Sequence, residues 1–165
     1  MTSVSIIPIE QGTARLRMLE AADLVTTLEW RNHPESRRWF LSTDLVTLES
    51  HENWFAGYLG RDDDYLFIVE DQGTPVAQVS LYRIRWDRGE AEFGRLLVAP
   101  AERGRGLSHL VTALCLRAAE QLGLGRLRLE VKVDNVRAIR GYERAGFRAA
   151  EGVSGDVLPM ELHVT

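Results

Sequence analysis

The chain has 165 residues, 45% of them hydrophobic, and a formal net charge of −4. A chain of this length suits one compact domain with a sizeable core, since folding buries roughly 70% of its unfolded surface. The acidic balance and the dispersed arginines argue against a nucleic-acid partner, which requires clustered Lys and Arg. No segment approaches the roughly 18 apolar residues of a membrane span, and residues 1–13 lack a signal-peptide pattern. We therefore expect no membrane partner and a cytoplasmic location.

The first third of the chain is predicted to contain one strand and three short helices. Residues 1–13 offer no clear partner for their apolar side chains and are expected to form an arm, which leaves residues 14–165 as a single domain. The expected strand is 14–19, and the expected helices are 21–32, 35–40 and 47–59. The third helix is expected to present one shared face, formed by Leu48, His51, Phe55 and Leu59.

The rest of the chain alternates between β-prone runs and two helices. Residues 65–69 and 76–85 flank a turn and predict a hairpin. Residues 107–122 form the best-patterned helix, on whose apolar face Cys115 is expected to be a buried structural thiol. The other expected elements are strands at 90–98, 126–133, 147–151 and 157–164 and a helix at 136–145. This order predicts an α/β (α+β) fold, with about seven strands in a mixed central sheet flanked by helices.

A glycine-rich loop links strand 90–98 to helix 107–122. At a helix N-terminus about four backbone N–H groups lack partners, and the peptide dipoles add roughly half a positive charge, so an anion binds there favourably. Gly104 and Gly106 allow the backbone to approach that anion closely, and Arg103 and Arg105 offer charge-assisted hydrogen bonds. The glycine spacing matches neither a P-loop nor a dinucleotide-binding fingerprint.

Two strings in this half of the chain resemble one enzyme superfamily. Arg103-Gly104-Arg105-Gly106-Leu107-Ser108 resembles the pyrophosphate loop of the GNAT superfamily of acyl-CoA-dependent N-acyltransferases, although Ser108 stands where Gly or Ala is usual. About thirty residues later, a strand that leads to Asn135, a short helix that carries Tyr142, and then Gly146-Phe147 resemble the closing signature of the same superfamily. The resemblance covers roughly residues 14–164.

The resemblance implies a bound acetyl-CoA co-substrate and no metal. In the superfamily, two parallel strands splay apart to hold the pantetheine arm, and here these would be the strands that end at Val98 and Val133. Backbone groups that are freed by the splay would pair with the pantetheine amides and polarise the thioester oxygen. The implied cofactor-binding residues are Leu97, Val98, Arg103, Gly104, Arg105, Gly106, Leu107, Ser108, Asn135 and Tyr142.

The resemblance also implies an acid and a base for acetyl transfer to an amine. Tyr142 matches the superfamily tyrosine that protonates the departing CoA sulfur, where it would contribute positioning and a partial proton. Glu130 and Glu92 are rival candidates for the base that deprotonates the amine, and each could instead be a solvated strand residue or a partner for an arginine. His51 is a third candidate, because the imidazole pKa is near 6.5.

The acceptor is the least transferable part of the resemblance. The aromatic and basic segments around Trp30 and Trp54 resemble a branch with nucleotide-linked amino-sugar acetyltransferases and ribosomal-protein acetyltransferases. The candidate substrate-binding residues are Trp30, Arg31, His51, Trp54, Gln78 and Ser80, although tryptophans at helical spacing are more often core. We expect the acceptor to be a primary amine of a small molecule, with a nucleotide-linked amino sugar favoured. A homodimer is the expected assembly to test. A peptide acetyltransferase and a non-catalytic acyl-CoA-binding module are the alternatives.

Overall fold

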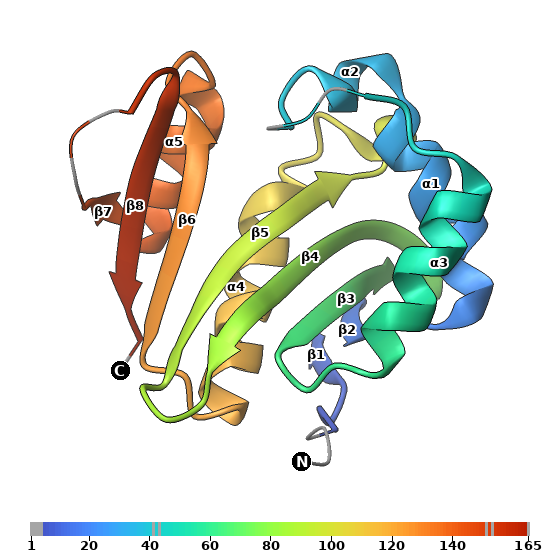
Figure 1. The fold of residues 1–165 in the computed structure, drawn as a ribbon, viewed down its shortest axis with the longest axis horizontal. Helices are drawn as coiled ribbons and strands as arrows, with labels where there is room; N and C mark the ends of the chain where they lie inside the picture. Colours follow the sequence, from blue (N-terminus) through green and yellow to red (C-terminus); the bar gives the residue numbers. More distant parts are fainter. Residues whose placement is uncertain (1–4, 41, 43, 151, 153, 165) are drawn as a thin grey trace.

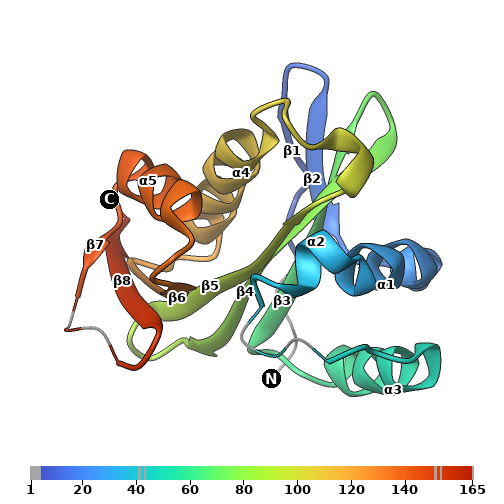
Figure 2. The same ribbon diagram turned by 90° about the horizontal axis from the view of Figure 1, so that it is seen from above.

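In the computed structural model, which describes residues 5–40, 42, 44–150, 152 and 154–164, one mixed β-sheet carries helices on both faces (Figures 1 and 2). Within these residues the sheet has eight strands in the order β1-β2-β3-β4-β5-β6-β8-β7. The strands are β1 Ile9–Gln11, β2 Ala14–Met18, β3 Asp64–Asp71, β4 Thr74–Arg85, β5 Glu90–Val98, β6 Arg126–Lys132, β7 Arg148–Ala149 and β8 Val157–His163. The predicted fold class is confirmed, with one strand more than expected.

The additional strand lies within the segment that was expected to be an arm. β1 pairs antiparallel with β2, from Ile9 opposite Leu16 to Gln11 opposite Ala14. Ile6 and Ile9 are buried in the main core. The described part of residues 1–13 therefore joins the sheet through β1, and Ile6 and Ile9 have the core partners that the sequence did not reveal, whereas Ile7 is exposed.

Helices α1, α2 and α3 cover one face of the sheet, and α4 and α5 cover the other (Figure 2). The helical segments are η1 Ala21–Asp23, α1 Leu24–Asn32, α2 Pro34–Arg37, α3 Leu48–Leu59, η2 Pro100–Glu102, α4 Leu107–Gln121 and α5 Val136–Ala145. The predicted face of α3 is wrong for Leu48 and Leu59, which are 44% and 65% exposed, whereas Phe55 packs inward and His51 contacts Thr27 of α1. The helix is rotated so that Tyr58 is buried, with Trp54 and Phe55 packed beside it.

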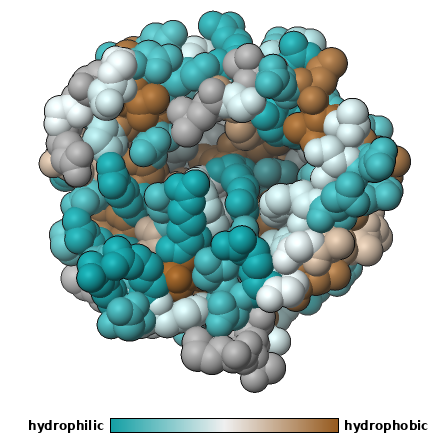
Figure 3. Space-filling model, viewed as in Figure 1, coloured by the Kyte–Doolittle hydropathy of each residue, from teal (hydrophilic) through white to brown (hydrophobic). Residues whose placement is uncertain are grey.

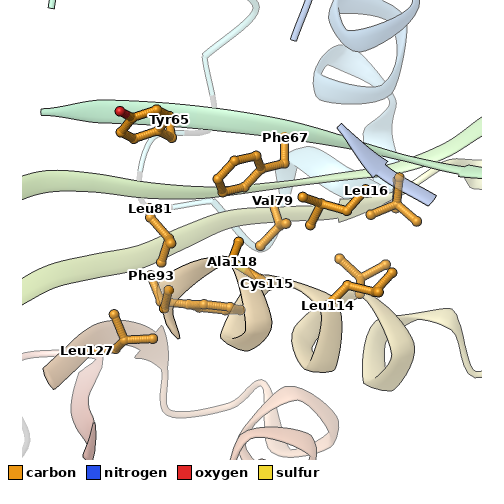
Figure 4. Packing of buried hydrophobic residues seen from close by; sticks show 14 of the residues in the cluster. Leu16, Tyr65, Phe67, Val79, Leu81, Phe93, Leu114, Cys115, Ala118 and Leu127 are labelled. Atoms are coloured by element: carbon orange, nitrogen blue, oxygen red, sulfur yellow. The ribbon is translucent and has the colours of Figure 1, made fainter. Parts of the chain in front are cut away.

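The main core lies between the sheet and α4 (Figure 4). Tyr65 and Phe67 of β3 point toward this side, whereas Leu66 and Ile68 point to the smaller core beneath α1 and α3. β3 is thus buried on both faces, which explains its continuous run of apolar residues. On the helix side, Cys115 is fully buried as predicted, and burial raises the pKa of its thiol.

The two central parallel strands diverge part-way along their length. β5 and β6 pair only from Glu90 opposite Arg126 to Glu92 opposite Arg128. Past this point the pairing of β5 with β4 continues to Val98, while β6 pairs with β8 on its other side. The facing edges of β5 and β6 therefore separate toward their C-terminal ends, as the resemblance implied.

Candidate active site

A cavity of about 330 Å³ lies where β5 and β6 diverge. Residues of β4, β5, β6 and α5 line it, together with residues of α1 and α2 and of the segment after α2. The face of the molecule seen in Figure 1 is hollowed near its middle, with hydrophilic residues prominent around the hollow (Figure 3). The cavity brings together Glu92, Gly94, Leu96, Glu130, Asn135 and Tyr142.

Tyr142 enters the cavity from α5. Its ring packs edge-on against Phe93 and Phe147, with centroids 5.8 Å away in both cases. Burial raises the pKa of Tyr142 to about 12. Its hydroxyl makes no hydrogen bond with a described residue, so the phenol is a protonated donor without a protein partner.

The two candidate bases line the same cavity but differ in their partners. The Glu92 carboxylate accepts hydrogen bonds from Nη1 of Arg83 at 3.1 and 3.3 Å. Glu130 is exposed and forms no ion pair with any residue that the structure describes. Of the two carboxylates, Glu92 thus has an ion-pair partner and Glu130 has none among the described residues.

The loop before α4 has the backbone that the sequence predicted. Gly104 and Gly106 have φ values of +84° and +72°, and a Cβ atom at either position would meet nothing within 4 Å. Gly106 is the N-cap of α4, and no side chain caps the helix. The first turn of α4 therefore presents its backbone N–H groups without a side-chain partner, as an anion-binding terminus requires. Ser108 in this turn is exposed, and Leu107 is buried.

The two loop arginines are engaged with other side chains. Arg103 donates to the Ser36 hydroxyl at 2.7 Å and to Glu35 at 3.3 Å, which fastens the loop to α2. Arg105 is ion-paired with Asp71 at 2.9 Å and also contacts Glu102. Both guanidinium groups would have to exchange or share these partners to reach a diphosphate.

The other cofactor-binding candidates lie where their backbones rather than their side chains can act. Leu97 is 5% exposed and packs with Trp30 and Ala99, and Val98 packs against the main core. The side-chain oxygen of Asn135 accepts a hydrogen bond from the Ala138 N–H at the start of α5. Asn135 thus shapes the helix that carries Tyr142 as well as lining the cavity.

The substrate-binding candidates are only partly brought together. Arg31 lines the cavity at the divergence, and Trp54 lines a second cavity of about 390 Å³. Neither cavity is lined by Trp30, Gln78, Ser80 or His51. For these four residues the structure does not support the expected substrate contact.

Packing explains why those four side chains lie elsewhere. Trp30 is 7% exposed, in a small apolar cluster, as is usual for a tryptophan at helical spacing. Gln78 and Ser80 are buried and bond to the backbone and guanidinium of Arg95. His51 bonds to the Thr27 hydroxyl at 2.9 Å, and burial lowers the pKa of its imidazole.

The sequence did not single out the residues that join the two cavities. Tyr82, Arg83 and Arg95 line both. Arg83 and Arg95 have φ values of +48° and +53°, and each lies at a register shift between β4 and β5. A β-bulge changes which side chain points into the site, and nothing in the alternation of the sequence predicts it.

Known proteins share both the sequence pattern and the fold of this chain. The model of the Acetyltransferase (GNAT) domain matches residues 14–148. The chain belongs to the GNAT acetyltransferase family. A spermidine N-acetyltransferase from Vibrio cholerae, solved in complex with CoA and spermine, shares the fold of this GNAT domain with a TM-score of 0.85 and 24% identity over 92% of this chain and 96% of the other.

Curated relatives carry several acceptor names. A mycothiol acetyltransferase of Mycobacteroides abscessus is 36% identical over 124 residues, which are 72% of this chain and 38% of the relative. An uncharacterized N-acetyltransferase of Methanocaldococcus jannaschii is 33% identical over 62% of this chain and 47% of the relative. The GNAT domain thus spans less than half the length of these two relatives. The spermidine N(1)-acetyltransferase of Vibrio cholerae is 26% identical over 80% of this chain and 77% of its own length.

The described residues contain no group of three or more His, Cys, Asp or Glu side chains placed to hold a metal ion. None of the helices in the described part of the chain combines the length and apolar character needed to cross a bilayer.

Proposed function

We propose that this GNAT domain transfers the acetyl group of acetyl-CoA to a primary amine of a small molecule, by direct attack within a ternary complex. The observation that carries the proposal is the position of Tyr142 and Glu130 in one cavity, at the divergence of two parallel strands. An uncapped helix N-terminus follows β5 through the glycine loop. These features match what acyl-CoA chemistry requires of a protein: an anion site, unpaired backbone groups, a base and a proton donor.

The glycine loop and α4 would hold the diphosphate of the co-substrate. Gly104 and Gly106 leave the backbone open there, and the dipole of the 15-residue helix favours a negative charge. The diverged edge of β5 would pair with the amides of the pantetheine arm. In the bound state, acetyl-CoA supplies an activated acyl group that an uncharged amine can attack.

Glu130 is the proposed base and Tyr142 the proposed acid. The free carboxylate of Glu130 would take the proton that the acceptor ammonium must lose, directly or through water. The Tyr142 phenol would donate a hydrogen bond to the sulfur as negative charge develops on it. A pKa of about 12 keeps this phenol protonated throughout the pH range of the reaction.

Substitution of the two carboxylates tests the assignment of the base. Glu130→Gln is expected to lower kcat/KM by about 10²–10⁴, which is the range for loss of a general base. Glu92→Gln is the matched control and is expected to have a smaller effect, because Arg83 already engages that carboxylate. The reverse order would move the base to Glu92.

Calorimetry with coenzyme A tests the donor site. Gly106→Glu is expected to weaken CoA binding about tenfold to a hundredfold, because a carboxylate would replace open space at the proposed diphosphate site. Gly123→Glu is the matched control: Gly123 also has a positive φ, of +74°, with nothing within 4 Å of a Cβ, but it follows the other end of α4. Absence of CoA binding by the unaltered chain, or equal loss in both variants, would refute the proposal.

The acceptor expected from the sequence, a nucleotide-linked amino sugar, stays a prediction. Relatives are named for mycothiol, spermidine and aminoglycoside acetylation, and these names favour a small amine over a peptide. Mass spectrometry of products from acetyl-CoA and a panel of amino sugars, polyamines, aminoglycosides and peptides would identify the class. CoA binding without any acetylated product would instead favour a non-catalytic acyl-CoA-binding module.

A further inference from the structure

The cavity at the divergence of β5 and β6 is unusually rich in arginine for a site that must accept an amine. Arg31, Arg83 and Arg95 all line it, and its carboxylates are Glu92 and Glu130. Two of the arginines have acidic partners: Arg83 pairs with Glu92, and Arg95 pairs with Asp64 at 2.8 Å. After these pairs are matched, one cation and one anion remain in the lining: Arg31 and Glu130.

Arg31 forms no ion pair with any residue that the structure describes, although Asp44 lies near enough to act on its charge. Its Nη2 donates to the Ser42 carbonyl at 2.8 Å, and its guanidinium lies 4.1 Å from the centroid of the Phe40 ring. Its Nη1 is buried and has no hydrogen-bond partner among the described residues. Burial, followed by the nearby charge of Arg37, lowers the pKa of Arg31. A buried guanidinium that has an N–H donor without a partner is stabilised when an anion binds to it.

Arg83 and Arg95 are held at the cavity by a backbone that side chains rarely adopt. Both residues have positive φ at β-bulges, a strained conformation that clusters at functional sites. The Arg95 guanidinium is fixed by Asp64 and lies 4.3 Å from the centroid of the Tyr82 ring. The Arg83 side chain is 71% exposed, so most of its donors face solvent. The two bulges thus place two guanidinium groups in the lining of the same cavity, one paired with Asp64 and the other paired with Glu92 and largely exposed.

We infer that the acceptor amine carries an acidic group, a carboxylate or a phosphate, which binds to Arg31 and Arg83 while the amine faces Glu130. This inference rests on the proposed acetyl transfer and names its substrate class. Planar guanidinium groups bind carboxylate and phosphate oxygens through paired hydrogen bonds, which gives them a geometric preference for such groups. Polyamines lack an acidic group and would meet only one unpaired carboxylate in this lining.

The test compares acceptors that differ only in the acidic group. Glucosamine 6-phosphate is compared with glucosamine, and 4-aminobutanoate with 4-aminobutanamide, as acceptors for acetyl-CoA. We expect kcat/KM to be at least about tenfold higher for the acidic member of one pair, the magnitude of one charge-assisted hydrogen bond. The pair that shows the preference distinguishes phosphate from carboxylate. Ratios near one in both pairs, or spermidine preferred over every acid, would overturn the inference.

Variants locate the acidic group. Arg31→Gln and Arg83→Gln are each expected to bring the acid-to-neutral ratio toward one, a readout that a general loss of stability would not move. Arg85→Gln is the matched control, because Arg85 lies on the same strand, is exposed and lines neither cavity. An unchanged ratio in both Arg31→Gln and Arg83→Gln would also refute the inference.

Calorimetry of the same pairs in the presence of CoA separates this inference from the proposed function. Selective binding of the acids without acetyl transfer would refute the proposed function but support a preference of the site for acidic ligands. Acetyl transfer to acidic and neutral amines alike would support the proposed function but refute the preference for acids.

Discussion

Removal of one oxygen atom, in Tyr142→Phe, separates catalysis from packing. The ring of Tyr142 packs against Phe93 and Phe147, while its hydroxyl has no hydrogen-bond partner among the described residues. If the tyrosine is there for packing, phenylalanine replaces it fully, because the ring contacts are the same. If the hydroxyl serves as the proton donor, the rate must fall although the fold is intact.

The structure fixes the sign of the expected stability change. A hydroxyl that is taken from water without a new hydrogen bond costs about 1–3 kcal/mol, and the Tyr142 hydroxyl has no hydrogen-bond partner among the described residues. Because the residue also lines the cavity, water relieves part of that cost. We therefore expect Tyr142→Phe to unfold with a free energy equal to that of the parent chain or up to about 1 kcal/mol higher. For a domain of this length the increase in Tm is at most about 4 °C.

Activity and stability are measured on the same preparation. We expect kcat for acetyl transfer to fall by about 10²–10⁴, in an assay of thiol release, with CoA affinity unchanged by calorimetry. Urea unfolding supplies the free energy. A variant that is less stable by more than about 1 kcal/mol would show that the hydroxyl has a structural partner, and full activity would exclude Tyr142 as the proton donor.

The remaining predictions concern ionisable groups and close packing. Asp23→Asn is expected to cost about 2 kcal/mol in urea unfolding, because it breaks a largely buried ion pair with Arg17 at 2.8 Å. Burial alone would raise the pKa of Asp23, but the hydrogen bonds from Arg17 and the backbone outweigh it and lower that pKa. The stabilisation is therefore present above about pH 4 and is lost as the pH falls further. Burial lowers the pKa of His51, so the parent chain should lose stability below about pH 6.5, and His51→Asn should lose less. In Gly94→Ala a Cβ would lie 2.9 Å from the Tyr82 ring; we expect a raised acceptor KM with unchanged CoA affinity.

Exposed counterparts serve as controls for these three variants. Glu10→Gln and His109→Asn remove a charge or an imidazole from exposed positions and should leave the free energy of unfolding and its pH dependence nearly unchanged. Gly125→Ala adds a methyl group whose nearest neighbour is 4.0 Å away and should leave both kinetic constants unchanged. An Asp23→Asn variant as stable as Glu10→Gln, or a pH profile that His51→Asn does not flatten, would contradict the reasoning.

The fold was largely predictable because periodicity follows burial. The two-sided burial of β3 appears in its sequence as a continuous apolar run, and the buried face of α4 appears as apolar residues at helical spacing. β1 was missed because its three residues pair only with β2 and its buried side chains contact distant elements. The face of α3 was misjudged at Leu48 and Leu59 because leucine spacing outweighed Trp54 and Tyr58, which the structure packs inward.

The candidate site was predictable where chemistry coincides with a motif. The glycine loop and Tyr142 lie in continuous strings, whereas Arg83 and Arg95 depend on bulges that interrupt strand alternation. The partners of Arg103 and Arg105 come from distant segments, so no local pattern reports that those guanidinium groups are engaged. Ion pairs and strand registers between segments far apart in the chain cannot be predicted from a single sequence.

The bulged strands β4 and β5 have a consequence for how this domain diversifies. The side chains at the two bulges belong to a different stretch of backbone from the loop that precedes α4, so evolution or a designer can exchange one without rebuilding the other. Most side chains are strained when the backbone is in the left-handed region, as it is at these two positions. Asparagine or glycine would relieve this strain. If Arg83 binds an acidic acceptor as inferred, its replacement by asparagine or glycine would relax that preference and relieve the strain together, whereas Arg95 must stay to pair with Asp64.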